Sequence, residues 1–329
     1  MHEILILIII LAVIFDIANG WHDAANAIAT VVSTKVLSPL TAVSLAALMN
    51  IAGAFFTTAV AKTVGTGIVD PLAVTDTVII AGLLSAILWN LITLFLGLPV
   101  SSSHALFGGI AGAAMAHGGV NIMNLDGIVK ILMSLLISPI LGFIIGYGFM
   151  KLILLMFGRL APGIMSKYFG RMQIFSSAFF AFGHGSNDAQ KAMGIITMAL
   201  VSGGFIQAME VPKWVIVTCA LAMGLGTLFG GWKIIKTLGV KMLKLEPVHG
   251  FSAETSATAV IITASHFGLP VSTTHVISSA ILGVGATRRL SAVRWGIAGK
   301  IVAAWVLTLP ACIAMAWGIQ LIFAHYRIG

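Results

Sequence analysis

Long apolar stretches, separated by short polar ones, follow one another along the whole chain. They cover residues 4–34, 40–61, 77–117, 128–157, 173–201, 214–232, 251–286 and 293–324. A helix needs about 20 apolar residues to cross the hydrocarbon core of a bilayer. The pattern therefore predicts an all-α polytopic membrane protein. Two stretches, 77–117 and 251–286, are too long for one simple span, and each contains Pro-Val-Ser in its interior.

Composition supports a lipid environment. Hydrophobic residues make up 59% of the chain and charged residues 9%, whereas a soluble domain carries about 25% charged residues. The net charge of +8 does not predict a nucleic-acid partner, because the basic residues lie in short loops between apolar stretches. Both cysteines lie inside apolar stretches, so neither a disulfide nor a metal framework is expected. The first stretch has no signal-peptide features and is interpreted as a retained membrane helix.

Two sequence motifs occur twice. Gly-Trp-His-Asp-Ala-Ala-Asn-Ala from Gly20 is similar to Gly-Ser-Asn-Asp-Ala-Gln-Lys-Ala from Gly185. Gly-Leu-Pro-Val-Ser-Ser-Ser-His from Gly97 matches Gly-Leu-Pro-Val-Ser-Thr-Thr-His from Gly268. We therefore expect two transmembrane repeats, residues 1–157 and 173–329, joined by a cytoplasmic linker at 158–172. In each repeat we expect a first helix broken at its polar motif (19–26 in the first repeat), then a plain span, a re-entrant hairpin and a last span.

The basic residues indicate the topology, because cytoplasmic loops carry an excess of Lys and Arg. If both Pro-Val-Ser segments are hairpin tips, one side of the membrane receives twelve basic residues: Lys35, Lys151, Arg159, Lys167, Arg171, Lys233, Lys236, Lys241, Lys244, Arg288, Arg289 and Arg294. The other side receives only Lys62, Lys130, Lys213 and Arg327. Each half then crosses three times, so the repeats have inverted topology and both termini face outward. The alternative is that the prolines only kink full spans.

Polar groups inside hydrocarbon are candidates for function, because burying them is costly. In inverted repeats the substrate site is expected near the midplane, where the halves meet. The hydroxyl tips, each preceding a half-helix, favour a small tetrahedral oxyanion. Carboxylates and amides suit a coupling cation instead. The candidates for the anion are Asn26, Ser101, Ser102, Ser103, Asn187, Gln190, Lys191, Ser272, Thr273 and Thr274, and those for the cation are Asp23, Asp188, Asn26, Asn187 and Glu254.

The doubled Gly-x-His/Asn-Asp-x-x-Asn/Lys-Ala motif, each followed by Pro-Val-Ser-x-x-His, resembles the inorganic phosphate transporter (PiT) family over essentially the whole chain. The resemblance is to a short bacterial member. It implies symport of inorganic phosphate with protons or sodium ions across the cytoplasmic (inner) membrane, an inverted-repeat fold, and commonly a homodimer. It places Asp23, Asn26, Asn187 and Asp188 near the cation and phosphate sites, and the hydroxyl tips against phosphate. No cofactor beyond the coupling ion and no enzymatic activity are implied.

Lys191 departs from the sodium-coupled pattern of the family, in which many members carry Asn at this position. An ammonium three residues from Asp188 can take the place of a sodium ion, so we expect proton coupling. If sodium is coupled instead, Asp23 and Asp188 are the expected metal ligands. Structural roles remain open: both aspartates as caps, Lys191 as a mere counter-ion, and Glu254 as a solvated first-turn acid. Sulfate remains an alternative substrate, because these motifs do not separate it from phosphate.

Overall fold

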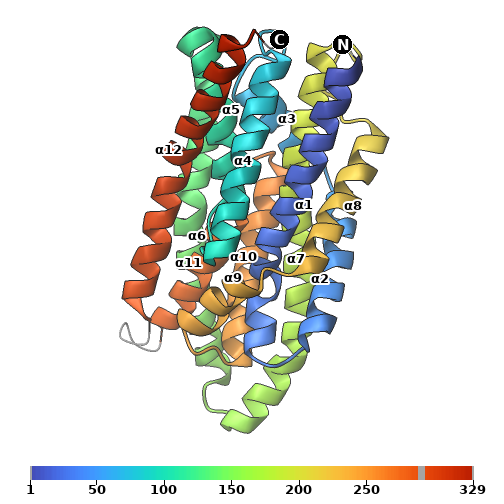
Figure 1. The fold of residues 1–329 in the computed structure, drawn as a ribbon. Coiled ribbons are helices and arrows are strands. Elements are labelled where there is room, and N and C mark those ends of the chain that lie inside the picture. The colour runs from blue at the N-terminus through green and yellow to red at the C-terminus, as the bar shows by residue number, and fades with distance from the viewer. Residues whose placement is uncertain (1, 288–292, 328–329) are drawn as a thin grey trace.

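The computed structural model describes residues 2–287 and 293–327, which form one elongated helical bundle with both termini at the same end (Figure 1). We call this the terminal end of the bundle. The first half contains α1 (His2–Ser33), α2 (Pro39–Ala54), α3 (Ala59–Gly67), α4 (Asp76–Leu96), α5 (Ser102–Gly118), η1 (Gly119–Ile122) and α6 (Leu125–Phe157). The second contains α7 (Pro162–Ser202), α8 (Lys213–Phe229), α9 (Trp232–Lys236), η2 (Thr237–Lys241), α10 (Pro247–His266), α11 (Thr273–Ala286) and α12 (Trp295–His325).

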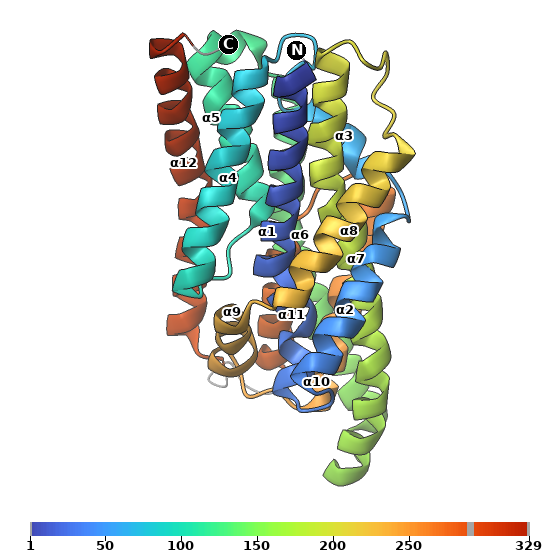
Figure 2. The same cartoon turned by 45° about the vertical axis from the view of Figure 1, so that its right-hand side comes forward.

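The two halves repeat the same element order in opposite orientations. The α4–α5 hairpin starts and finishes at the terminal end, whereas the α10–α11 hairpin starts and finishes at the opposite end (Figures 1 and 2). Among the described residues, five helices are long and apolar enough to cross a membrane, or up to seven if each of two bent pairs is one span. This architecture confirms the all-α membrane fold with inverted repeats and hairpins. Arg288 and Arg289, which we assigned to a cytoplasmic loop, lie outside the described residues.

The breaks are not where the sequence led us to expect them. We expected the first helix of each half to be interrupted at its polar motif, and this is wrong: α1 and α7 continue through 19–26 and 185–192. The motif glycines serve helix contacts instead, since a Cβ on Gly20 would lie 2.5 Å from the Met223 carbonyl oxygen and one on Gly185 2.2 Å from that of Asn50. The bent elements are the expected plain spans, α2–α3 at 75° and α8–α9 at 62°.

The segment 158–172, expected to be a linker, is mostly helical. The helix α7 begins at Pro162 and continues for 41 residues, and its first turns project beyond the bundle at the end opposite the termini (Figure 2). Proline suits the first position of a helix because its missing N–H is not needed there. Only residues 158–161 therefore separate α6 from α7. The repeat boundaries at 157 and 173 remain predictions.

Each hairpin packs against the last long helix of the other half. The helix α5 lies on α12, where a Cβ on Gly112 would stand 2.3 Å from the Ile313 carbonyl oxygen. The helix α11 lies on α6, where a Cβ on Gly283 would stand 2.2 Å from the Phe143 carbonyl oxygen. Small residues allow such close approach of membrane helices. This exchange of packing partners brings the two hairpin tips together between α1 and α7.

Candidate functional site

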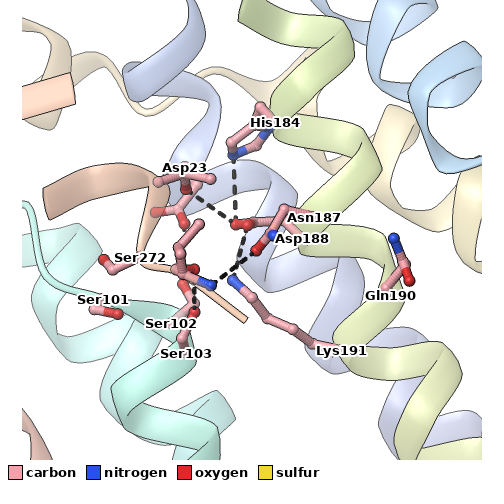
Figure 3. A network of polar contacts seen from close by, with 12 residues as sticks. Asp23, Ser101, Ser102, Ser103, His184, Asn187, Asp188, Gln190, Lys191 and Ser272 are labelled. Carbon is pink, nitrogen blue, oxygen red and sulfur yellow. Dashed lines mark hydrogen bonds and ion pairs between the residues drawn. The ribbon is translucent and has the colours of Figure 1, made fainter. Parts of the chain in front are cut away.

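A buried polar cluster lies where the middles of α1 and α7 meet the two hairpin tips (Figure 3). Its centre is formed by Asp23 on α1 and by His184 and Asp188 on α7, whose candidate ligand atoms all lie within 4.8 Å of one another. All three side chains are buried. Charged groups inside a membrane protein are costly unless they are paired, so the neighbours of these carboxylates determine what the cluster can bind.

Asp23 is contacted by hydroxyls from both hairpins. Ser102 at the first tip donates to Oδ2 over 3.3 Å, and Thr274 at the second tip donates to Oδ1 over 3.4 Å. The neighbouring His22 places Nδ1 2.7 Å from Oδ1, and its Nε2 lies 3.2 Å from the Thr93 hydroxyl of α4. One carboxylate on α1 therefore links the first helix to both hairpins.

Asp188 has a different set of partners. The Lys191 ammonium, one turn along α7, lies 2.9 Å from Oδ1, and Nε2 of His184 lies 3.5 Å from Oδ2. Thr273 at the second tip donates to Oδ2 over 3.2 Å. His184 is itself held by Asn50 of α2, whose Oδ1 lies 3.0 Å from Nδ1. Asp188 is thus part of a buried ion pair, and Asp23 has no ammonium among its hydrogen-bonding or ion-pair partners in the described chain.

The hairpin tips are built alike. Ser101 caps α5 by accepting a hydrogen bond from the His104 N–H at 3.2 Å, and Ser272 caps α11 by accepting from the His275 N–H at 3.2 Å. Such N-cap hydroxyls satisfy N–H groups that a helix start leaves free. The tips also contact one another, because Ser103 donates to the Val271 carbonyl at 3.1 Å.

The signature asparagines hold the second tip in place. Asn26 donates from Nδ2 to the Thr274 hydroxyl at 2.8 Å. Asn187 donates to the Ser265 hydroxyl at 3.0 Å and accepts from the Val271 N–H at 3.3 Å. Both predicted residues therefore lie at the site, and each has a clear positioning contact with the α10–α11 hairpin.

Two predicted residues lie apart from the centre. Gln190 points away from Asp188 and Lys191 (Figure 3). Its Oε1 accepts a hydrogen bond from the Ala61 N–H in the first turn of α3 at 3.0 Å, and its Nε2 donates to the Ser186 carbonyl. Gln190 thus stabilises the bend between α2 and α3.

Glu254 forms a separate buried cluster. Thr30 of α1 donates to it at 2.6 Å and Gln173 at 3.0 Å, and Ser176 also donates. These three donors satisfy the Glu254 carboxylate, and none of them belongs to the central cluster. Glu254 is fully buried, so the alternative of a solvated first-turn acid is wrong.

Two buried groups lie outside the set of predicted site residues. His184, which flanks the second motif, belongs to the centre, and the signal was its position four residues before Asp188, one helical turn away. Asp16 is fully buried in α1, and its signal was an acid within an otherwise apolar stretch. The histidines of the two tips also meet, with the rings of His104 and His275 4.7 Å apart.

The arrangement offers complementary binding chemistry. Two helix N-termini, those of α5 and α11, meet beside several hydroxyls and one ammonium, a combination that favours an anion. The carboxylates of Asp23 and Asp188, with neighbouring hydroxyl oxygens, are suitable ligands for a hard monovalent cation. The Lys191 ammonium already pairs with one oxygen of Asp188. A bound cation would therefore find more free carboxylate oxygen around Asp23 than around Asp188.

Comparison with known proteins agrees with this geometry. The sequence model of the phosphate transporter family matches the chain twice, over residues 19–165 and 161–316. A "probable low-affinity inorganic phosphate transporter" of Bacillus subtilis is 52% identical over 93% of this chain and 92% of its own length. One of the same description from Rhizobium meliloti is 49% identical over 94% and 93%. A solved structure described as "the sodium-dependent phosphate transporter" superposes with a TM-score of 0.90 at 26% identity, over 98% of this chain and 99% of that one.

These matches cover nearly the whole chain, and the two matched segments fall on the two inverted halves. The chain is a multi-pass membrane protein that belongs to the phosphate transporter family.

Proposed function

We propose that this protein takes up inorganic phosphate by cation symport, with the proton as coupling ion, through alternating access at the interface of the two repeats. The observation that carries the proposal is the buried pair between Lys191 and Asp188, 2.9 Å apart, beside the two hydroxyl-bearing tips. The phosphate transporters among its relatives support the substrate. The sequestered position of the cluster between oppositely oriented hairpins suits alternating access.

Phosphate is preferred over sulfate because of the acceptors in the site. Phosphate retains a proton near neutral pH and can donate a hydrogen bond to Asp23, whereas sulfate has no proton to donate. The hydroxyls of Ser102, Ser103, Thr273 and Thr274 donate to its other oxygens. Ser101 and Ser272 contribute by capping the half-helices whose N-termini face the anion. Sulfate remains the second candidate, since the same donors accept any tetrahedral oxyanion.

Proton coupling follows from the charge at Asp188. A sodium ion needs a free carboxylate, and here an ammonium already compensates that carboxylate. Asp23 and Glu254 are then the groups that carry protons through the transport cycle, and Asn26 and Asn187 position the tip. In a sodium-coupled protein, Asp23 and Asp188 would hold the metal, and the structural neighbour is described as sodium-dependent.

We further propose that the protein lies in the cytoplasmic (inner) membrane with both termini outside, as a homodimer of chains with repeats at 1–157 and 173–329. Basic residues of the connections support this orientation, because Lys35 between α1 and α2, Arg159 between α6 and α7, and Lys244 between η2 and α10 lie at the end opposite the termini. Cysteine labelling of Arg327→Cys in intact cells tests the orientation, and labelling only after the membrane is opened would contradict it.

The decisive experiment is uptake of labelled phosphate into proteoliposomes under an imposed proton or sodium gradient. A proton gradient should drive accumulation in sodium-free buffer. Loss of all transport there, restored by sodium at fixed pH, would overturn proton coupling. Sulfate in competition tests the substrate: displacement of phosphate at comparable concentration would make sulfate the substrate or an equal one.

A further inference from the structure

A third buried polar cluster lies on α1, nearer the terminal end than Asp23. Asp16, Asn19 and Asp23 are spaced three and four residues apart, which places them along one face of the helix. Asp16 precedes Asp23 by seven residues, about 10 Å along the helix axis at 1.5 Å per residue. The cluster around Asp16 is therefore distinct from the proposed phosphate site.

The groups of this cluster are buried, and their polar atoms lack hydrogen bonds of good geometry. Asp16, Asn19 and Asn90 of α4 are all 0% exposed. Both carboxylate oxygens of Asp16 and both terminal atoms of each asparagine lack a well-formed hydrogen bond to any residue in 2–287 or 293–327, although Asn19 lies close enough to interact with the Asp16 carboxylate. Native proteins satisfy most buried polar atoms, so three such side chains in one region indicate a ligand.

The helix register places Asn90 of α4 at the level of Asn19 of α1. The starts of α1 and α4 line one cavity at the terminal end, where Leu7 lies near Ile80, so the two helices run in the same direction (Figure 1). The contact between His22 and Thr93 at 3.2 Å aligns them. Asn19 and Asn90 each precede that contact by three residues and so lie at about the same level along the two helices.

The groups of the described chain that act on Asp16 leave its carboxylate without a paired charge. From α7, Lys191 attracts and Asp188 repels its carboxylate, Asn19 lies next to it on α1, and the Cys219 thiol is near it on α8. The ammonium is already paired with Asp188 and does not form an ion pair with Asp16. An ionised carboxylate left without a partner in such a place costs several kcal/mol, which a bound proton or metal ion removes.

We propose that Asp16, with the amide oxygens of Asn19 and Asn90, forms a second coupling site that binds a monovalent cation, a proton or a sodium ion, on the terminal side of the phosphate site. A proton would bind to the carboxylate alone. A sodium ion would also use the two amide oxygens, since hard cations take oxygen ligands. The inference rests on the proposed symport and adds a cation to it.

The test measures steady-state phosphate accumulation in proteoliposomes with the membrane potential clamped at zero. Each cation coupled to a tenfold gradient raises the accumulation ratio about tenfold, equivalent to about 1.4 kcal/mol. Asp16→Asn should therefore lower the ratio about tenfold relative to the unsubstituted protein. The measurement is made once with a proton gradient in the absence of sodium and once with a sodium gradient at equal pH. The gradient under which Asp16→Asn loses its tenfold accumulation identifies the ion that binds. Asn90→Ala should weaken the effect of sodium but not that of protons.

Ser278→Ala is the matched control, because it removes another buried, unpartnered polar atom outside this cluster. An unchanged accumulation ratio for Asp16→Asn under both gradients would overturn the second site but leave symport intact. If neither gradient drives the unsubstituted protein, symport fails and the second site fails with it. If Asp16→Asn is inactive, thermal unfolding of the purified protein decides: the stabilisation by sodium or by acidification should shrink in the variant, and an unchanged shift contradicts the site.

Discussion

The two halves hold an aspartate at equivalent places but surround it with different charge. Asp23 interacts with His22 and two hydroxyls, whereas Asp188 forms an ion pair with Lys191. The position equivalent to Lys191 is Asn26, which donates to a tip hydroxyl. The backbone frame is therefore duplicated and the chemistry is not. A site built in this way can present a carboxylate free to bind a cation beside one whose charge is already compensated.

This difference in charge also makes the two halves unequal partners in transport. Under the alternating access proposed above, a group in one half would meet in turn the environment of its equivalent in the other. A fixed ammonium in only one half makes the two states electrostatically different. We expect the coupling ion to be chosen by that difference, and the following predictions are ordered by the size of the expected effect.

The largest expected effect comes from removing Asp188. Asp188→Ala leaves the Lys191 ammonium buried without its partner, which costs about 3–5 kcal/mol for a broken buried pair. Asp23→Ala should cost less, because Asp23 has no ammonium partner among the described residues that its removal would leave unpaired. Both variants should lose phosphate uptake, and thermal unfolding in detergent should separate them, with Asp188→Ala the less stable. The double variant Asp188→Ala/Lys191→Met should recover stability but not uptake. Equal stability of the two single variants would show that the two aspartates do not differ in the energetic cost of losing their partners.

The second prediction makes the halves alike. Lys191→Asn copies the Asn26 position and frees the Asp188 carboxylate, which then needs a cation. Uptake in sodium-free buffer should fall by about tenfold or more, equivalent to about 1.4 kcal/mol, and added sodium at fixed pH should restore it. Lys191→Arg is the control that keeps the charge. Sodium-independent uptake by Lys191→Asn would show that this ammonium does not select the ion.

Sequence patterns predicted the frame of this molecule better than the contacts within it. The repeated motifs and the basic loops gave the inverted hairpins, because the lipid environment permits few backbone arrangements. The same patterns misplaced the helix breaks, since polar residues in α1 and α7 looked like interruptions but the chain stays helical there. Gln190 was assigned to the anion from its place in the motif, and only the fold shows that it caps α3. Asp16 escaped notice because it lies outside the repeated motif.

The third prediction concerns the equivalent hydroxyls of the tips. Ser102 donates to Asp23 and Thr273 donates to Asp188. Each is one of several hydrogen bonds to its carboxylate, so its loss should have a smaller effect than the loss of a charged group. Ser102→Ala should affect function more than Thr273→Val, because Asp188 keeps its ammonium partner when the hydroxyl is removed. The concentration of phosphate giving half-maximal uptake measures this, and Ser102→Thr is the control that keeps the donor. A larger effect of Thr273→Val than of Ser102→Ala would contradict this prediction, because it would make the hydroxyl beside Asp188 the more important one.

The smallest expected effect, and the most symmetrical, concerns the two N-cap serines. Ser101→Ala and Ser272→Ala each remove one cap, with the same partner distance of 3.2 Å, and each should cost about 1 kcal/mol of stability. Thermal unfolding should show equal small shifts, and Ser101→Asn and Ser272→Asn should restore them, since Asn also caps well. If either alanine variant instead loses phosphate affinity without losing stability, its hydroxyl contacts the anion directly and the sequence-based assignment of that serine to the phosphate site is the better one. Equal stability losses with unchanged affinity would mean that the halves share their scaffold at the tips and diverge only at the charged residues of α1 and α7.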